Sequence, residues 1–126
     1  MINAETVNFD TPQLARAVEA MPLAAIDRLP FGAVHVDRHG AVSFYSKREG
    51  QLSGFGDRPV LGLQFFEQIA PCMKGPFFKG RIEEAQAAGL LDLEFSHVGD
   101  FADRARELHV RAQSASGGGI WLFIAR

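Results

Sequence analysis

Apolar and polar residues alternate one by one in two segments of the second half of the chain, residues 91–97 and residues 108–113. This period of two is typical of strands with one buried face, because successive side chains of a strand point to opposite sides of the sheet. Residues 120–125 form a short apolar run, for which we expect another strand. The pattern therefore predicts three strands in the last third of the chain.

Two further β-rich runs lie earlier, at residues 33–36 and 41–45. The four residues between them end in Gly40, which suits a hairpin turn. Residues 114–119 include three consecutive glycines and are predicted to form a second hairpin loop, which leads into the last strand. Five strands joined largely by hairpins imply an antiparallel sheet.

Helical signals fall outside these strands. Thr11 is expected to cap a helix and Pro12 to occupy its first position, because threonine suits the N-cap and proline lacks only an N–H that has no helical partner there. We interpret residues 1–30 as a small N-terminal helical cap. Residues 46–89 are predicted to form several short helices, the longest over residues 76–88, since glycine and proline interrupt this segment repeatedly.

The order of these elements indicates an α+β fold: a PAS-like five-stranded antiparallel sheet with flanking short helices and an N-terminal helical cap. The 126 residues suffice for one domain, of which residues 31–126 form the core. No internal repeat or low-complexity segment interrupts it.

Charge and hydropathy limit the partners. The net charge is -2, and no cluster of Lys and Arg supplies the footprint that binding to a phosphate backbone needs, so we expect no nucleic-acid partner. No apolar run approaches the ~20 residues that span a bilayer, and the first residues lack a cationic signal region. We therefore expect a cytoplasmic protein without a membrane partner, present as a monomer or weak dimer.

Cys72 is the only cysteine of the chain, so no internal disulfide exists. It follows Ala70 and Pro71, which places it on a loop or a helix end. A thiol near a helix N-terminus is activated by a lowered pKa. A thiol surrounded by phenylalanines is instead buried and inert. Both interpretations of Cys72 remain open from the residues alone.

Glu49 and Tyr45 are equally ambiguous. Ser46 and Glu49 have the spacing of a capping box, in which the glutamate closes the N-terminus of a helix, and spacing alone favours this interpretation. Alternation along residues 41–45 places Tyr45 on the opposite face of the strand from Val42. The four histidines lack the paired spacing of a metal site, and no nucleophile elbow or acid/base pair is present, so we do not expect an enzyme.

Several short motifs together resemble the photoactive yellow protein family, the small bacterial blue-light receptors of PAS fold. The resemblance runs from about Leu29 to the last residue and is carried by Phe31-Gly32-Ala33, Tyr45, Glu49-Gly50, Gly62-Leu63-Gln64-Phe65-Phe66, Ala70-Pro71-Cys72 and Trp121-Leu122-Phe123. The spacing of Tyr45, Glu49 and Cys72, combined with the Phe-Phe and Ala-Pro-Cys segments, makes it specific.

The resemblance implies that Cys72 carries p-coumaric acid (4-hydroxycinnamic acid) as a thioester, with Tyr45 and Glu49 donating hydrogen bonds to its phenolate oxygen. In this family, light isomerises the chromophore from trans to cis. Glu49 would then transfer its proton, and the buried carboxylate would drive a signalling change, which we expect in residues 1–30. The implied pocket and its surroundings comprise Ser53, Phe55, Phe65, Phe66, Ala70, Pro71, Phe78, Phe101 and Leu122.

Three residues depart from the family pattern. The family commonly has an arginine at the position of Phe55, a tyrosine at Phe101 and a methionine at Asp103, so spectral tuning and recovery are expected to differ. The partner is an unidentified downstream signalling protein. The alternative is a chromophore-free PAS module that binds another ligand or a protein, with Glu49 as a helix cap and Cys72 as a core thiol.

Overall fold

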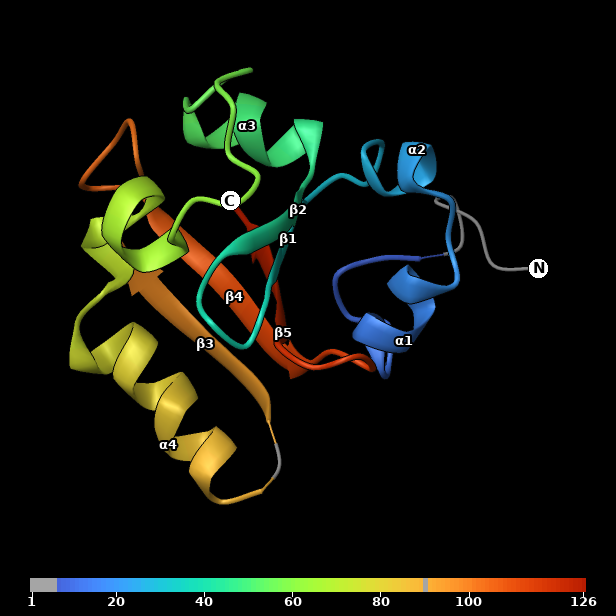
Figure 1. Cartoon of the computed structure of the whole chain (residues 1–126). Helices are drawn as coiled ribbons and strands as arrows, with labels where there is room; N and C mark the ends of the chain where they lie inside the picture. The colour runs from blue at the N-terminus through green and yellow to red at the C-terminus, as the bar shows by residue number, and fades with distance from the viewer. Residues whose placement is uncertain (1–6, 90) are drawn as a thin grey trace.

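A five-stranded antiparallel sheet forms the centre of the protein, whose computed structural model describes residues 7–89 and 91–126 (Figure 1). The strands lie in the order β2-β1-β5-β4-β3, and every neighbouring pair is antiparallel. The α+β prediction is therefore confirmed. The strands are β1 (Gly32–Val36), β2 (Val42–Tyr45), β3 (Asp92–Val98), β4 (Glu107–Ser114) and β5 (Ile120–Ala125).

Short helices lie outside the sheet. Two of them, α1 (Leu14–Glu19) and α2 (Leu23–Ile26), precede the first strand. The remaining helices connect β2 to β3: α3 (Lys47–Ser53), η1 (Phe65–Ile69), η2 (Pro71–Met73), η3 (Pro76–Gly80) and α4 (Arg81–Ala87). The single helix predicted over residues 76–88 is thus a π-helical turn continued by an α-helix. Within the described residues, no helix has the length and hydropathy needed to cross a membrane.

The sheet separates two hydrophobic cores. The cap cluster, on the side of α1 and α2, consists of Val7, Leu14, Ala15, Ala17, Val18, Met21, Ala25, Ile26, Leu29, Phe31, Ala33, Ala115, Trp121 and Phe123. The inner cluster, on the side of the other helices, is built from strand residues together with aromatic and aliphatic residues of the connecting helices: Val34, Val36, Val42, Phe55, Val60, Phe65, Phe66, Ile69, Ala70, Met73, Phe78, Ile82, Leu91, Phe95, Leu108, Val110, Ala112, Ile120, Leu122 and Ile124.

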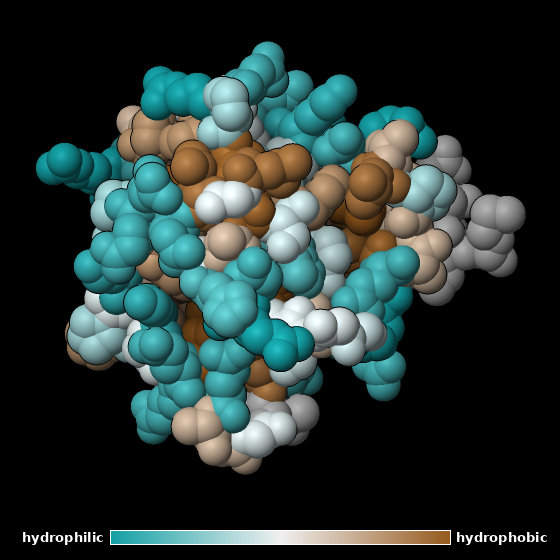
Figure 2. Space-filling view, in the orientation of Figure 1, coloured by the Kyte–Doolittle hydropathy of each residue, from teal (hydrophilic) through white to brown (hydrophobic). Residues whose placement is uncertain are grey.

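The middle strand β5 explains why its sequence is apolar throughout. Its side chains alternate between Trp121 and Phe123 in the cap cluster and Leu122 and Ile124 in the inner cluster. A strand with both faces buried has no polar positions to alternate with. The outer surface differs by region: apolar atoms gather in the area of α3, whereas the area of α4 is mostly hydrophilic (Figure 2).

The predicted start of the first helix is wrong. The helix α1 begins at Leu14 after Gln13, which has a positive φ of 50°. The Thr11 hydroxyl instead accepts a hydrogen bond from the Asn8 N–H at 2.9 Å and closes a turn. Arg111 of β4 donates to the Thr11 carbonyl at 2.8 Å, so a contact with the sheet holds this segment outside the helix. The first six residues of the predicted cap lie outside the described residues.

The predicted orientation of Tyr45 relative to Val42 is also wrong. Val34 pairs with Tyr45 and His35 with Phe44, but Val36 pairs with Val42, so Ser43 is an extra residue. Such a β-bulge shifts the alternation of the strand by one position. Val42 and Tyr45 consequently both face the inner cluster, and the bulge brings the phenol of Tyr45 to the side of α3.

Candidate functional site

The side chain of Glu49 lies in the first turn of α3, between this helix and the sheet. Ser46 caps α3, because its hydroxyl accepts a hydrogen bond from the Glu49 N–H at 3.1 Å. The second half of a capping box is absent, since the Ser46 N–H donates to the Ala33 carbonyl at 2.9 Å and the Glu49 carboxylate points elsewhere. The interpretation of Glu49 as a capping side chain is therefore wrong.

Gly32 makes room for this carboxylate. A Cβ atom at residue 32 would lie 1.8 Å from Oε1 of Glu49, far inside van der Waals contact. Any larger residue at the start of β1 would displace the Glu49 side chain. The glycine of the Phe31-Gly32-Ala33 motif thus serves the site directly.

Arg126, which follows β5, binds the Glu49 carboxylate with two parallel hydrogen bonds. Nη1 donates to Oε1 at 2.8 Å and Nη2 donates to Oε2 at 2.9 Å. The same guanidinium donates to Asp100, from Nε at 2.6 Å and from Nη2 at 3.0 Å. The side chains of Glu49, Arg126 and Asp100 are only 4%, 7% and 1% exposed. Arg106 completes the group with a 3.2 Å contact to Asp100.

This group of charges, the Glu49–Arg126–Asp100–Arg106 cluster, shifts the pKa values of its members. Burial raises the pKa of Glu49 above its ordinary value, while the hydrogen bonds and charge of Arg126 offset part of that rise. Burial alone would lower the pKa of Arg126, but its bonds to Glu49 and Asp100 raise it overall. Two arginines and two carboxylates leave the cluster formally neutral when all four groups are charged.

Tyr45 lies beside this cluster and is held by Ser53. The two hydroxyl oxygens are 3.3 Å apart, and the Ser53 hydroxyl also accepts from the Phe55 N–H at 3.2 Å. Burial, and then the negative charge of Glu49, raises the pKa of Tyr45 well above its ordinary value. Its phenol is therefore a permanently protonated hydrogen-bond donor at neutral pH.

Cys72 lies in η2, at the edge of a cavity of about 510 Å³. The residue is exposed, which contradicts the interpretation of Cys72 as a buried core thiol. Burial of the sulfur, and then the charge of Asp100, raises the pKa of the thiol, so the thiol is not activated by its surroundings. The cavity is mostly apolar and is lined by Gln68, Ile69, Pro71, Cys72, Val98, Gly99, Asp100, Phe101 and Arg104.

Two contacts connect this cavity with the buried polar groups around Glu49 and Tyr45. Asp100 lines the cavity and is bridged by Arg126 to Glu49. Phe101 also lines it and packs edge to face on Phe55 at 4.9 Å between ring centres, and Phe55 in turn packs on Tyr45 at 6.2 Å. A thioester-linked phenol requires a thiol, an apolar space and buried polar groups that can bind its oxygen, and the residues present fit such a group.

The other residues expected around the pocket lie in different places. Phe65, Phe78 and Leu122 are buried in the inner cluster, and Ala70 belongs to the same cluster next to Pro71. Phe55 is buried, with the Arg58 guanidinium 5.2 Å from its ring centre. Phe101 is 41% exposed, and Asp103 is exposed on the loop before β4.

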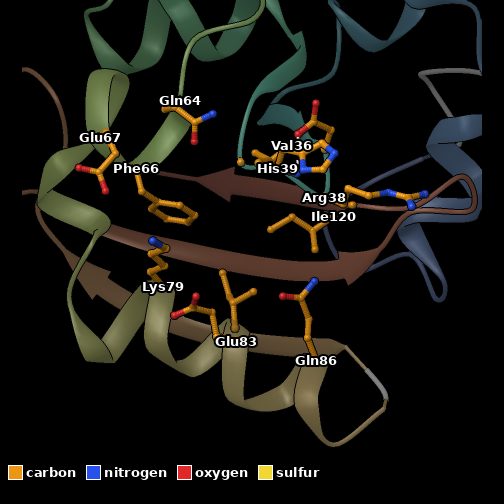
Figure 3. A pocket seen from close by; sticks show the side chains of 14 residues that line it. Val36, Arg38, His39, Gln64, Phe66, Glu67, Lys79, Glu83, Gln86 and Ile120 are labelled. Carbon is orange, nitrogen blue, oxygen red and sulfur yellow. Dashed lines mark hydrogen bonds between the residues drawn. The ribbon is translucent and has the colours of Figure 1, made fainter.

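Phe66 lines a different cavity, of about 350 Å³, between η1, α4 and the turns that follow β1 and precede β5 (Figure 3). Phe66 and Ile120 lie toward its middle, and Lys79, Glu83 and Gln86 approach from the side of α4. Acidic and basic side chains alternate around its rim. Cys72, Tyr45 and Glu49 are not part of this cavity.

The sequence did not predict four residues of the site: Gly32, Asp100, Arg106 and Arg126. Asp100 and Arg126 are 26 positions apart, and Arg126 is 77 positions from Glu49, so no local pattern links them. The available signal was indirect: a glycine beside the buried Phe31 and Ala33, and a single arginine directly after an apolar strand.

Comparison with known proteins identifies close relatives, although no family model matches the chain. A photoactive yellow protein of Rhodothalassium salexigens is 34% identical over 123 residues, which cover 97% of this chain and 98% of the relative. A photoactive yellow protein of Rhodobacter capsulatus is 36% identical over 126 residues with the same coverage. The crystal structure of the photoactive yellow protein domain from the sensor histidine kinase Ppr of Rhodospirillum centenum is similar with a TM-score of 0.75, at 33% identity over 86% of this chain and 96% of that one.

Proposed function

The chain belongs to the photoactive yellow protein family, and we propose that it is a blue-light photoreceptor with p-coumaric acid bound to Cys72 as a thioester. One observation carries the proposal: the accessible Cys72 thiol lies on an apolar cavity whose walls, at Asp100 and Phe101, contact the groups around the buried Glu49 and Tyr45. When bound, the chromophore would supply absorption of blue light and isomerisation of its double bond from trans to cis.

Three residues would have distinct roles toward the bound chromophore. Tyr45 would donate a hydrogen bond to the phenolate oxygen, and its raised pKa keeps its own proton in place. Ser53 would orient the Tyr45 hydroxyl. Glu49 would donate in its protonated form, which burial favours, and would transfer its proton after illumination. The new charge on Glu49 would change its contacts, and this rearrangement would drive the conformational change of the signalling state.

Because the thiol pKa of Cys72 is raised, attachment requires an activated ester or thioester of the acid. The apolar side chains of Ile69, Val98 and Phe101 would exclude water from the bound group. No turnover of a substrate is part of this function.

The alternative, a chromophore-free PAS module, is favoured by one specific observation. Arg126 satisfies both oxygens of Glu49 from within the protein itself, so the buried carboxylate has a complete structural role as an ion-pair partner. In this alternative the cavity at Cys72 would bind another small ligand.

The downstream partner is also a proposal. The similar solved domain is part of a sensor histidine kinase. We propose that this chain likewise signals to another protein, through a surface that changes when the cap cluster loosens from the sheet.

Reconstitution with an activated ester of p-coumaric acid tests the function. The native protein should gain the mass of one p-coumaroyl group and a visible absorption band that bleaches in blue light. Cys72→Ala should gain neither, while its far-UV circular dichroism stays native, because this thiol is the only one in the chain. A native protein with unchanged mass, or an adduct that persists in Cys72→Ala, would contradict the proposal.

A further inference from the structure

Arg126 is the nearest charged partner of Glu49, and the geometry of their contact defines the charge of the glutamate. Both carboxylate oxygens accept a hydrogen bond from the guanidinium, at 2.8 and 2.9 Å. A guanidinium is always charged and offers only donors, so its two-pronged contact matches an ionised carboxylate. In this arrangement Glu49 is a carboxylate and has no proton to donate.

The charge and hydrogen bonds of Arg126 favour the ionised form of Glu49, whereas burial and the charge of Asp100 favour the protonated form. Tyr45 approaches from β2 and stays neutral, Asp100 approaches from the loop after β3, and Arg126 approaches from β5. Arg106 neutralises Asp100, which leaves the positive charge of Arg126 to balance Glu49. Glu49 is almost completely buried, so water cannot stabilise its charge. The ionised form of Glu49 is therefore stable only while Arg126 is paired with it.

The donor role proposed for Glu49 needs the opposite state. A carboxyl that donates to a phenolate must be protonated and must turn away from the N–H groups of Arg126. Arg126 does not lose its place when Glu49 leaves, since Asp100 still accepts two of its hydrogen bonds. The arginine thus remains fixed beside Glu49 in both states.

We propose that Arg126 is the internal counter-ion of Glu49: the glutamate is ionised and paired with Arg126 in the chromophore-free protein, and it returns to Arg126 after it has transferred its proton in the light. The light-dependent half of this inference rests on the proposed photoreceptor function. The carboxylate formed in the light is then not an isolated buried charge but one with a prepared partner, and Arg126 prolongs the light state by stabilising it. Arg126 is a positioning residue, because it acts through Glu49.

Infrared spectroscopy of the chromophore-free protein tests the pairing. The native-minus-Glu49→Gln difference spectrum at neutral pH should contain carboxylate bands and no carboxylic C=O band. Arg126→Gln should acquire a carboxylic C=O band that disappears in the Arg126→Gln, Glu49→Gln double variant, because a buried carboxyl without its counter-ion takes up a proton. A carboxylic band of Glu49 already present in the native protein would overturn the proposal.

Two further variants keep this test decisive. Arg111→Gln removes another buried arginine, which binds the carbonyls of Phe9 and Thr11 on the opposite side of the sheet, and it should leave the Glu49 bands unchanged. Arg126→Lys retains the charge without the two-pronged contact and should retain the carboxylate. If Arg126→Gln does not fold, the infrared spectra of the native protein and of Arg126→Lys still test the pairing. A carboxylic C=O band of Glu49 in both spectra would refute it.

Dark recovery after a flash tests the light-dependent half in reconstituted protein. Arg126→Gln should recover about tenfold faster or more than the native protein, since the ionised Glu49 has lost its partner, and Arg126→Lys should lie between them. Equal recovery rates would refute the role of Arg126 in the light. If no chromophore binds, the proposed photoreceptor function and the light-dependent role of Arg126 are both refuted. The infrared spectra of the chromophore-free protein still test the pairing of Glu49 with Arg126.

Discussion

The two faces of the sheet are held to their helices in different ways. On the cap side, α1 and α2 pack through the cap cluster, and hydrogen bonds join the cap to the sheet: the Ala15 N–H donates to Oε1 of Gln113 at 2.7 Å, and Arg111 donates to the Thr11 carbonyl at 2.8 Å. Glu19 also accepts hydrogen bonds from the Trp121 Nε1–H at 3.0 Å and from the Ser116 N–H at 2.9 Å. On the inner side, the Glu49–Arg126–Asp100–Arg106 cluster is buried within the packing itself.

In the proposed photoreceptor, this difference would separate the residues that stabilise the fold from those that respond to light. Apolar contacts of the cap are non-directional and have no second state, so they fix the cap without responding to a proton. A buried carboxyl between two partners does have a second state, because a single proton transfer changes its charge where water cannot compensate. We infer that Glu49, on the inner face, is the group that responds to the proton transfer. The helices of the cap face are the part that would detach when the sheet changes.

The largest expected effect comes from the cap cluster. Leu14 is completely buried, and Leu14→Ala should lower the free energy of unfolding by about 2–5 kcal/mol, because it removes packed atoms and leaves a cavity. Chemical denaturation would measure this loss. Leu23→Ala is the matched control: Leu23 is 64% exposed in α2, and its truncation should cost no more than about 0.5 kcal/mol. Similar costs for both variants would mean that the cap is not held by this core.

An intermediate effect is expected from the close approach of the sheet to α3. Gly32→Ala places a methyl group against Glu49 and should cost about 1–3 kcal/mol, with a shift of the infrared bands of Glu49 as its side chain loses the contact with Arg126. Gly117→Ala makes the same chemical change in open space on a loop and should change the free energy of unfolding by less than about 0.5 kcal/mol. A Gly32→Ala protein as stable as Gly117→Ala would show that Glu49 is not confined there.

The smallest effect, opposite in sign on the two faces, is the dependence of stability on pH. Burial alone would raise the pKa of Glu19, but hydrogen bonds from Ser116 and Trp121 lower it below the ordinary 4.5. Its contribution is therefore present above pH 4.5 and is lost as the pH falls through the lowered value. The raised pKa of Glu49 works the other way: its contribution is present below 4.5 and is lost as the pH rises through the raised value.

Denaturation across about pH 3 to 8 measures both contributions. Relative to the native protein, Glu19→Gln should lose more stability at neutral than at acidic pH. Glu49→Gln should flatten the decline in stability that accompanies rising pH. Identical pH profiles for the two variants would remove the distinction between the faces.

The sequence by itself determined the strands and the presence of a single thiol. Side-chain alternation depends only on the backbone of a strand, so residues 91–97 and 108–113 revealed their strands directly. The solitary Cys72 was likewise visible in the chain, but its predicted place on a loop or a helix end is wrong, because Cys72 is the middle residue of the helix η2. The apolar run of β5 predicted a strand, and the structure shows that both faces of this strand are buried.

Only the tertiary structure decided how the site is assembled. The bulge at Ser43 turned Tyr45 toward the inner cluster, because register depends on the partner strand and not on the local sequence. Glu49 and Arg126 are 77 positions apart in the chain and come into contact because β5 pairs with β1. Gly32 on β1 leaves space for the carboxylate of Glu49. Local periodicity contains no information about such long-range neighbours, so the charge state of Glu49 follows from the folded protein alone.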